Sequence, residues 1–213
     1  EQIEWADNPF LNVEELKLIE SSLSPEELES RKYGRFMGCD GLVYKEFDEN
    51  VNVIDPFLVP HEWYDKIAID PGLNNPLSAH WYAVDFDGNV YVIAEHFERN
   101  KDIEYHSNCI KEICKKLNWH TNYNGKISAL IDSAANQKTL ASLKSVAELF
   151  YDYDIQVDTN VNKDMFSGIA RVKQYLKNAK GESKLFIFKN CPNRIREFKS
   201  YFWGDEDKPI KKD

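Results

Sequence analysis

Two short apolar segments, each followed by an aspartate, constrain the fold of this chain most strongly. The first is Ile67-Ala68-Ile69-Asp70, followed by Pro71-Gly72, and the second is Ile127 to Ile131, followed by Asp132 and Ser133. A carboxylate beside an apolar core is costly unless a cationic group compensates it. If the two segments are neighbouring strands of one sheet, their ends bring two carboxylates within reach of one divalent cation.

The charge of the chain is unevenly distributed along its 213 residues. Residues 1–160 hold 14 Lys and Arg against 29 Asp and Glu, a balance of −15, whereas residues 161–213 hold 13 against 7, a balance of +6. Such an asymmetry indicates that the C-terminal portion contacts a polyanion. The alternative is that these lysines and arginines form the solvated face of a C-terminal helix.

The four cysteines, Cys39, Cys109, Cys114 and Cys191, form no Cys-x-x-Cys pair and have no histidine at zinc-ligand spacing. This pattern disfavours a structural zinc and a disulfide framework, and it fits a reducing cytoplasm. No apolar run is long enough to span a bilayer, and the N-terminus has no signal-peptide pattern, so we expect no membrane association. The chain begins at Glu1 and ends at Asp213, and both ends are expected to be cut from a longer protein.

Periodicity predicts an α/β fold with a mixed sheet flanked by helices. The Asp87-Gly88 turn between two β-rich runs predicts a hairpin. Strands are predicted at residues 41–44, 67–70, 80–86, 90–94, 127–132, 155–157 and 185–188, and helices at about 102–117, 137–150, 164–178 and 192–203, with a further helix starting at Ser24. The residues expected on the inward faces are Leu140, Leu143, Val146, Ala147 and Phe150 for 137–150, and Met165, Ile169, Val172 and Leu176 for 164–178.

The ends of the two aspartate-bearing strands are the predicted site of chemistry, because functional groups gather at the carboxyl ends of adjacent strands. Asp70 and Asp132 would act as oxygen ligands of Mg²⁺ or Mn²⁺, and a pair of such ions suits phosphodiester cleavage. The alternative is that each aspartate only caps the turn or helix that follows it. The chain has no Walker-type loop and only nine glycines, so a P-loop ATPase is excluded and an actin-like kinase, which needs a second glycine-rich loop, is disfavoured.

An ordered series of segments over about residues 30–213 resembles the nuclease part of the large terminase subunits of tailed bacteriophages. No single segment is decisive, but their order is specific. The segments are Gly41–Asp48, Ile67–Gly72 with Asn75-Pro76, Val92–Glu95, Ile131–Ala134, Lys163 with Gly168–Val172, Phe198 with Tyr201 and Trp203, and Lys208–Asp213.

The resemblance implies an RNase H-like fold and a two-metal endonuclease that cuts concatemeric double-stranded viral DNA. Asp70 and Asp132 match the first two metal ligands of the family, and Asp213 matches the start of the segment that carries the third. Because that segment is incomplete here, the third ligand is either Asp213 or a later residue. Residues 1–30 would connect to an N-terminal ATPase domain, and residues 31–213 would form a nuclease domain that is incomplete at its C-terminus. The implied partners are DNA, the ATPase domain, the small terminase subunit and the portal protein, in the cytoplasm of a bacterial host.

Further residues are assigned secondary roles. Glu95, at the end of the predicted hairpin, is a weaker candidate for a metal ligand. Lys163, Arg171, Lys173 and Arg194 are candidates for phosphate contacts, against the alternative of ordinary surface positions. The five histidines and the Tyr201-Phe202-Trp203 cluster are interpreted as mainly structural. Two other functions remain open: another RNase H-like enzyme such as a Holliday-junction resolvase, and a non-catalytic module that docks DNA or the portal.

Overall fold

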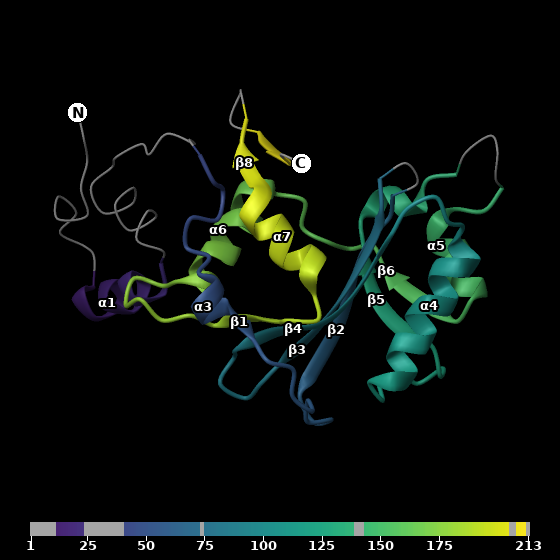
Figure 1. Ribbon diagram of the computed structural model, residues 1–213, viewed down its shortest axis with the longest axis horizontal. Coiled ribbons are helices and arrows are strands. Elements are labelled where there is room, and N and C mark those ends of the chain that lie inside the picture. Colours follow the sequence, from purple (N-terminus) through teal and green to yellow (C-terminus); the bar gives the residue numbers. More distant parts are fainter. Residues whose placement is uncertain (1–11, 24–40, 73–74, 139–142, 205–207, 212–213) are drawn as a thin grey trace. The chain divides into compact units, whose positions relative to one another are not determined.

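The computed structural model describes residues 12–23, 41–72, 75–138, 143–204 and 208–211, which fall into two compact units (Figure 1). The sheet unit comprises residues 55–163 and 188–193, and the helical unit comprises the described parts of residues 1–54, 164–187 and 194–213. The predicted helix start at Ser24 lies outside the described residues. In the part of the chain that the structure describes, no helix combines the length and the apolar character needed to cross a bilayer.

The sheet unit is built on a mixed sheet whose strands have the order β4-β3-β2-β5-β6. The strands are β2 (Tyr64–Asp70), β3 (Leu77–Val84), β4 (Val90–Glu98), β5 (Ile127–Ile131) and β6 (Ile155–Asp158). β2, β3 and β4 are antiparallel neighbours, whereas β2, β5 and β6 run parallel. The mixed α/β architecture predicted from the sequence is therefore confirmed.

The hairpin between β3 and β4 closes where the sequence predicts it. Gly88 adopts a φ of 78°, a left-handed conformation that glycine adopts without a steric penalty. Asp85 accepts hydrogen bonds from the backbone N–H groups of Asp87 and Asn89, which fixes the turn. These contacts explain why a short Asp-Gly sequence connects two long strands.

Helices cover the sheet at β4 and β6. α4 (Ile103–Lys116) begins at Asp102, whose side chain caps the N–H of Tyr105, and packs against β4. α5 (Val146–Asp152) packs against β6, as Figure 1 shows. The core between them is apolar and includes Trp81, whose indole N–H donates to the sulfur of Cys114.

The start of the helix predicted at 137–150 is wrong. α5 begins only at Val146, because Ser145 and Glu148 form a capping box in which each side chain accepts from the backbone N–H of the other. A short 3₁₀ helix, η2 (Ser133–Asn136), precedes it. Leu143, expected on the buried face, is 92% exposed.

The helical unit combines short helices with short strands. Its elements are α1 (Val13–Ser22), α3 (Glu49–Asn52), β1 (Val53–Ile54) beside β7 (Leu185–Phe188), α6 (Met165–Leu176), α7 (Pro192–Ser200), and β8 (Tyr201–Trp203) paired with β9 (Pro209–Lys211). The ends of β7 and α7 that fall within residues 188–193 belong to the sheet unit. Phe198 of α7 packs against the rings of Tyr44 and Phe47, which supports a structural role for the aromatic residues here.

Three predictions in the helical unit need correction. Residues 41–44 form no strand, and only Leu42 makes a single bridge, to Phe202. The helix predicted at 192–203 ends at Ser200, because Tyr201 to Trp203 pair with β9 instead. Met165 is exposed at the first position of α6, where the helix is not yet covered by its neighbours.

Candidate functional site

Asp70 and Asp132 lie at the carboxyl ends of neighbouring parallel strands. Ile69 at the end of β2 is paired with Ile131 at the end of β5, so the two aspartates are the next residues on adjacent strands. Strands are about 4.8 Å apart, and side chains alternate between the two faces. Since Ile69 and Ile131 are both buried, the two carboxylates are directed to the opposite face of the sheet. The sequence prediction that the two residues meet at one sheet edge agrees with this register.

The turn after Asp70 is tightly folded. A Cβ atom at Gly72 would lie 2.5 Å from the carbonyl oxygen of Asn75 and 2.8 Å from that of Pro76. Only glycine avoids this clash, so Gly72 allows the backbone to fold back directly behind the carboxylate. The turn therefore fixes the position of Asp70 at the end of β2.

Asp132 is held by two donors on the same oxygen. Its Oδ1 accepts from the backbone N–H of Ala134 at 2.7 Å and from the Lys163 ammonium at 2.9 Å. The Ala134 N–H, and next the Lys163 ammonium, hold the pKa of the Asp132 carboxyl below its ordinary value. Oδ2 makes no hydrogen bond or ion pair with the described residues, and the side chain is 43% exposed. The capping alternative for Asp132 is thus observed, and it leaves one carboxylate oxygen for a cation.

A polar row crosses β3 and β4 next to Asp70. Ser78 is paired with Asp70, and His80 is paired with Glu95, so all four side chains share one face of the sheet. Ser78 Oγ is 3.3 Å from His80 Nδ1, and His80 Nε2 is 3.9 Å from a Glu95 carboxylate oxygen. Ser78 and His80 were not assigned to the site from the sequence, although the alternation of polar and apolar residues along β3 is a signal for them.

Glu95 is engaged from a second side. Its Oε1 accepts from the backbone N–H of Asn193 at 2.9 Å and from the Asn193 side-chain amide at 2.8 Å, and its side chain is only 6% exposed. These bonds join β4 to the start of α7. They favour a supporting role for Glu95 over the role of direct metal ligand that was considered from the sequence.

The four basic residues proposed for phosphate contacts have different surroundings. Lys163 is beside Asp132, in the sheet unit. In the helical unit, Arg171 is exposed with its guanidinium 5.2 Å from the Tyr175 ring centroid. Arg194 is 3.6 Å from a Glu197 carboxylate oxygen and lies over the Phe198 ring.

Lys173 requires a correction. The side chain is buried, and its ammonium is 3.7 Å from the Glu46 carboxylate. A buried lysine that neutralises a buried glutamate holds the fold together and is not presented to a phosphate backbone. Lys173 is therefore removed from the set of candidate phosphate contacts.

The donors at the sheet edge suit a hard divalent cation. Asp70 and Asp132 supply carboxylate oxygens, and the ammonium of Lys163 competes with a cation only at Asp132 Oδ1. Asp213, the predicted third ligand, lies outside the described residues. Within the described ranges, no set of three or more histidine, cysteine or acidic side chains is arranged to hold a metal ion. The two aspartates thus form part of a ligand set.

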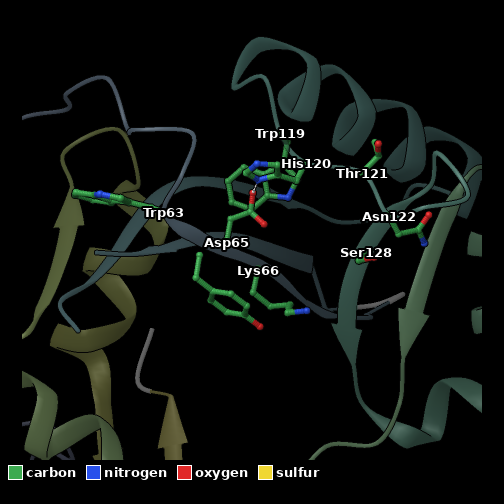
Figure 2. A pocket seen from close by; sticks show the side chains of 9 residues that line it. Trp63, Asp65, Lys66, Trp119, His120, Thr121, Asn122 and Ser128 are labelled. Carbon is green, nitrogen blue, oxygen red and sulfur yellow. Dashed lines mark hydrogen bonds and ion pairs between the residues drawn. The ribbon is translucent and has the colours of Figure 1, made fainter. Parts of the chain in front are cut away.

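Two histidine pairs were not anticipated from the sequence. At the start of β2, His120 Nδ1 is 2.5 Å from Asp65 Oδ2, and His120 Nε2 is 2.9 Å from His61 Nδ1. Figure 2 shows Asp65 and His120 joined to each other. Both line a hollow of about 330 Å³ whose wall also includes Trp63 and Trp119. Because Asp65 lies near the start of β2 and Asp70 at its end, this hollow is distinct from the predicted site.

A second histidine pair is buried between β4 and α4. Here His96 Nε2 is 2.8 Å from His106 Nδ1. Burial lowers the pKa of both histidines. Each pair joins residues of different elements, which a pattern of single histidines does not reveal.

The fold defines the class of protein to which this chain is similar. A mixed sheet of this strand order, flanked by helices and with aspartates at the ends of adjacent parallel strands, is that of RNase H-like nuclease domains. No protein-family model matches the chain, and no curated protein does.

Solved structures of large terminases share this fold. The large terminase of a thermophilic bacteriophage matches 99% of this chain and 51% of its own chain, with a TM-score of 0.73 and 19% identity. The P22 large terminase nuclease domain matches 80% of this chain and 84% of its own, with a TM-score of 0.64 and 16% identity. This chain thus spans about half the length of the terminase from the thermophilic phage. At these identities the comparison establishes the fold, and the fold expected from the terminase resemblance is confirmed.

Proposed function

We propose that this chain is the nuclease part of a viral DNA-packaging terminase and that it cleaves double-stranded DNA with two divalent metal ions. The observation that supports this most directly is the pair of carboxylates at the ends of β2 and β5, in a fold shared with the P22 large terminase nuclease domain. Duplex DNA is the substrate because the nuclease fold is coupled, in our proposal, to a genome-packaging motor.

Each residue at the sheet edge has a defined task in this proposal. Asp70 would hold both ions and Asp132 one, while Asp213 or a later residue would complete the set. Mg²⁺ or Mn²⁺ would activate the attacking water and stabilise the leaving oxygen. Lys163, which lies 2.9 Å from Asp132 Oδ1, would orient that carboxylate and meet the phosphate that enters the site.

The remaining parts of the proposal concern the complete protein. Residues 1–30 would lead to an N-terminal ATPase domain and residues 31–213 would form the nuclease domain. The small terminase subunit and the portal would be its partners in the packaging motor, in the cytoplasm of the infected bacterium. Arg171 and Arg194 would add sequence-independent contacts to the DNA backbone.

The test is digestion of supercoiled plasmid by the purified chain with Mg²⁺, Mn²⁺ or EDTA. Asp70→Asn is expected to reduce Mn²⁺-dependent cleavage by at least 100-fold without a change in circular dichroism, since it removes a ligand charge and keeps the side-chain shape. Asp154→Asn is the matched control. Asp154 is exposed, has a φ of 67° that asparagine also tolerates, and precedes β6 at the opposite edge of the sheet. Retained cleavage by Asp70→Asn would refute the assignment.

A further inference from the structure

Three polar side chains in the sheet unit join the turn before β2 to the loop after α4. Asp65 Oδ2 is 2.5 Å from His120 Nδ1, and His120 Nε2 is 2.9 Å from His61 Nδ1. Asp65 and Asp70 are five residues apart on β2, which is about 17 Å at the rise of a β-strand. An ion bound by the two histidines is therefore not shared with the aspartates at the ends of β2 and β5.

The contact with Asp65 determines which nitrogen of His120 can bind a metal ion. An ionised carboxylate accepts hydrogen bonds and donates none, so the proton in this contact is on His120 Nδ1. In the neutral ring, Nε2 then carries the lone pair. Histidines that bind metals almost always donate their other ring N–H to a carboxylate, a carbonyl or water, which orients the ring and makes it a stronger ligand.

His61 and His120 lie side by side, unlike the other histidine pair. Between His96 and His106 the nitrogens are 2.8 Å apart and the ring centroids 5.1 Å apart, as expected for rings that meet end to end. Between His61 and His120 the nitrogens are 2.9 Å apart, but the centroids are only 3.7 Å apart. In this arrangement both nitrogens can face one ion.

The spacing of these two nitrogens indicates the kind of ion. Nitrogens bound to a metal at about 2.05 Å are about 2.9 Å apart at a right angle and about 3.3 Å apart at a tetrahedral angle. The observed 2.9 Å matches the right angle, which is typical of Cu²⁺ and Ni²⁺ with nitrogen ligands. Mg²⁺ and Mn²⁺ prefer oxygen ligands and do not suit this pair.

The backbone beside each histidine is held by a hydrogen bond. The N–H of Trp63 donates to the carbonyl of Pro60, which closes the turn that contains His61. The N–H of Trp119 donates to a carbonyl in the last turn of α4, which fixes the chain where His120 begins the loop. The two ligands are therefore presented from fixed positions, and metal binding requires only small rotations of their rings.

Both histidines are accessible to a hydrated ion. His61 is exposed, and the side chain of His120 is 41% exposed. Lys66 lines the same hollow as His120, but Figure 2 shows its ammonium directed away from the His120 ring. That ammonium is 5.7 Å from the ring centroid of Tyr64. Its positive charge is thus not placed between the two histidines.

We propose that His61 Nδ1 and His120 Nε2 bind one Cu²⁺ or Ni²⁺ ion and that Asp65 orients His120 for this task. The site has two protein ligands, in keeping with the finding that no group of three or more histidine, cysteine or acidic side chains among the described residues is arranged to hold a metal. Water completes the coordination of the ion. The bound metal connects the turn before β2 with the loop after α4 and stabilises the folded chain. The proposal does not depend on the nuclease function.

Calorimetric titration with Ni²⁺ and with Mg²⁺ at pH 7.5 tests the site. The reference chain has no histidine tag and carries Asp70→Asn and Asp132→Asn, which remove the carboxylates of the proposed nuclease centre. Ni²⁺ is expected to bind this chain in a 1:1 ratio and at least roughly 100-fold more tightly than Mg²⁺. Absence of Ni²⁺ binding would overturn the metal site and leave the nuclease assignment unaffected.

Four variants of the reference chain assign the ligands. Asp65→Asn is expected to lower the Ni²⁺ affinity by about 10–100-fold, the usual effect of removing a group that orients a ligand. His61→Gln and His120→Gln should each lower it at least as much. Asp154→Asn is the matched control and should leave it unchanged, because the Asp154 carboxylate is paired with the Lys126 ammonium at 3.2 Å. Circular dichroism reports whether each variant keeps the fold.

Electron paramagnetic resonance of bound Cu²⁺ identifies the ligand atoms. In the reference chain labelled with ¹⁵N-histidine, coupling to two imidazole nitrogens is expected, and His120→Gln should leave one. Asp65→Asn should still show two at saturating Cu²⁺, because Asp65 orients a ligand and does not bind the ion. The proposal would be overturned by Ni²⁺ binding that survives in both histidine variants, by equal affinities of Asp65→Asn and Asp154→Asn, or by a reference spectrum without two imidazole nitrogens.

Discussion

At the residue scale, Gly72 matters twice: the backbone of its turn requires glycine, and this turn positions Asp70 in the site. A Cβ atom there would meet two carbonyl oxygens at under 3 Å, so Gly72→Ala must displace the turn behind Asp70. We expect this variant to lower the free energy of unfolding by about 1–3 kcal/mol and plasmid cleavage by at least tenfold. Urea unfolding and the plasmid assay measure the two effects.

Gly168 provides the matched control for this change. It lies inside α6 with no atom within 4 Å of an added Cβ. Gly168→Ala should therefore raise the free energy of unfolding by about 0.5–1 kcal/mol, through the better helix propensity of alanine. Equal stability of the Gly72→Ala chain and the unsubstituted chain would show that the turn does not need glycine.

A variant of Lys163 tests whether its ammonium contacts phosphate or only pairs with Asp132. In Lys163→Gln, the ion pair with Asp132 is lost but the Ala134 N–H still holds the carboxylate. If Lys163 contacts phosphate, the slope of log affinity for DNA against log salt should fall by about 1. Mn²⁺ affinity, measured by calorimetry, should not weaken, because a competing cation has been removed. An unchanged salt slope would restrict Lys163 to the ion pair.

At the element scale, the His96–His106 pair links β4 to α4 and makes stability depend on pH. Burial lowers both pKa values in the folded chain, whereas the unfolded chain has histidine pKa values of about 6.5. As pH falls below 6.5, the two histidines bind protons in the unfolded chain but not in the folded chain. The free energy of unfolding is therefore highest above this pH and declines below it. The loss is at most about 1.4 kcal/mol per histidine for each pH unit.

Urea unfolding at pH 7.5 and 5.5 measures this effect. The double variant His96→Gln, His106→Gln should lose less stability between the two pH values than the unsubstituted chain. Glutamine can still form a hydrogen bond between the elements but does not titrate. A loss of equal size in both chains would assign the pH dependence to other groups.

Strand and helix types could be predicted from periodicity, but several element boundaries could not. α4 and β7 agree closely with their predicted ranges because caps and apolar periods coincide there. The start of α5 was missed because the capping box at Ser145 and Glu148 outweighs the apolar period that continues before it. The segment at 41–44 has β propensity, but with β8 it forms only one bridge and two flanking backbone hydrogen bonds, which is too short a ladder to make a strand.

The site could be predicted only in part. The apolar runs before Asp70 and Asp132 predict from the sequence that both residues follow strands, but the parallel pairing that makes these strands neighbours is seen only in the structure. The pairing of Lys173 with Glu46, or of His106 with His96, joins different elements and depends on how those elements pack. The periodicity of the sequence does not show which side chains of different elements meet.

At the scale of the whole molecule, the DNA substrate distinguishes the three remaining hypotheses for function: a terminase nuclease, a junction resolvase and a non-catalytic docking module. The chain carries a net charge of −9, yet residues 161–213 have a balance of +6, so DNA contact is expected to be local and sensitive to salt. In the proposed terminase function, linear duplex DNA is a sufficient substrate. A junction resolvase reads the shape of four strands instead.

We expect the chain with Mn²⁺ to cut linear duplex and a four-way junction of the same sequence at rates within about threefold, and to cut neither in EDTA. Both substrates present the same phosphodiesters to Asp70 and Asp132, so a site that recognises only the backbone has no basis for preference. Cleavage of labelled oligonucleotides at equal strand concentration measures the ratio, and Asp70→Asn gives the background. A preference of about 100-fold for the junction would favour the resolvase. Binding of both substrates without metal-dependent cleavage, by this chain and by a longer chain that continues past residue 213, would favour a docking module.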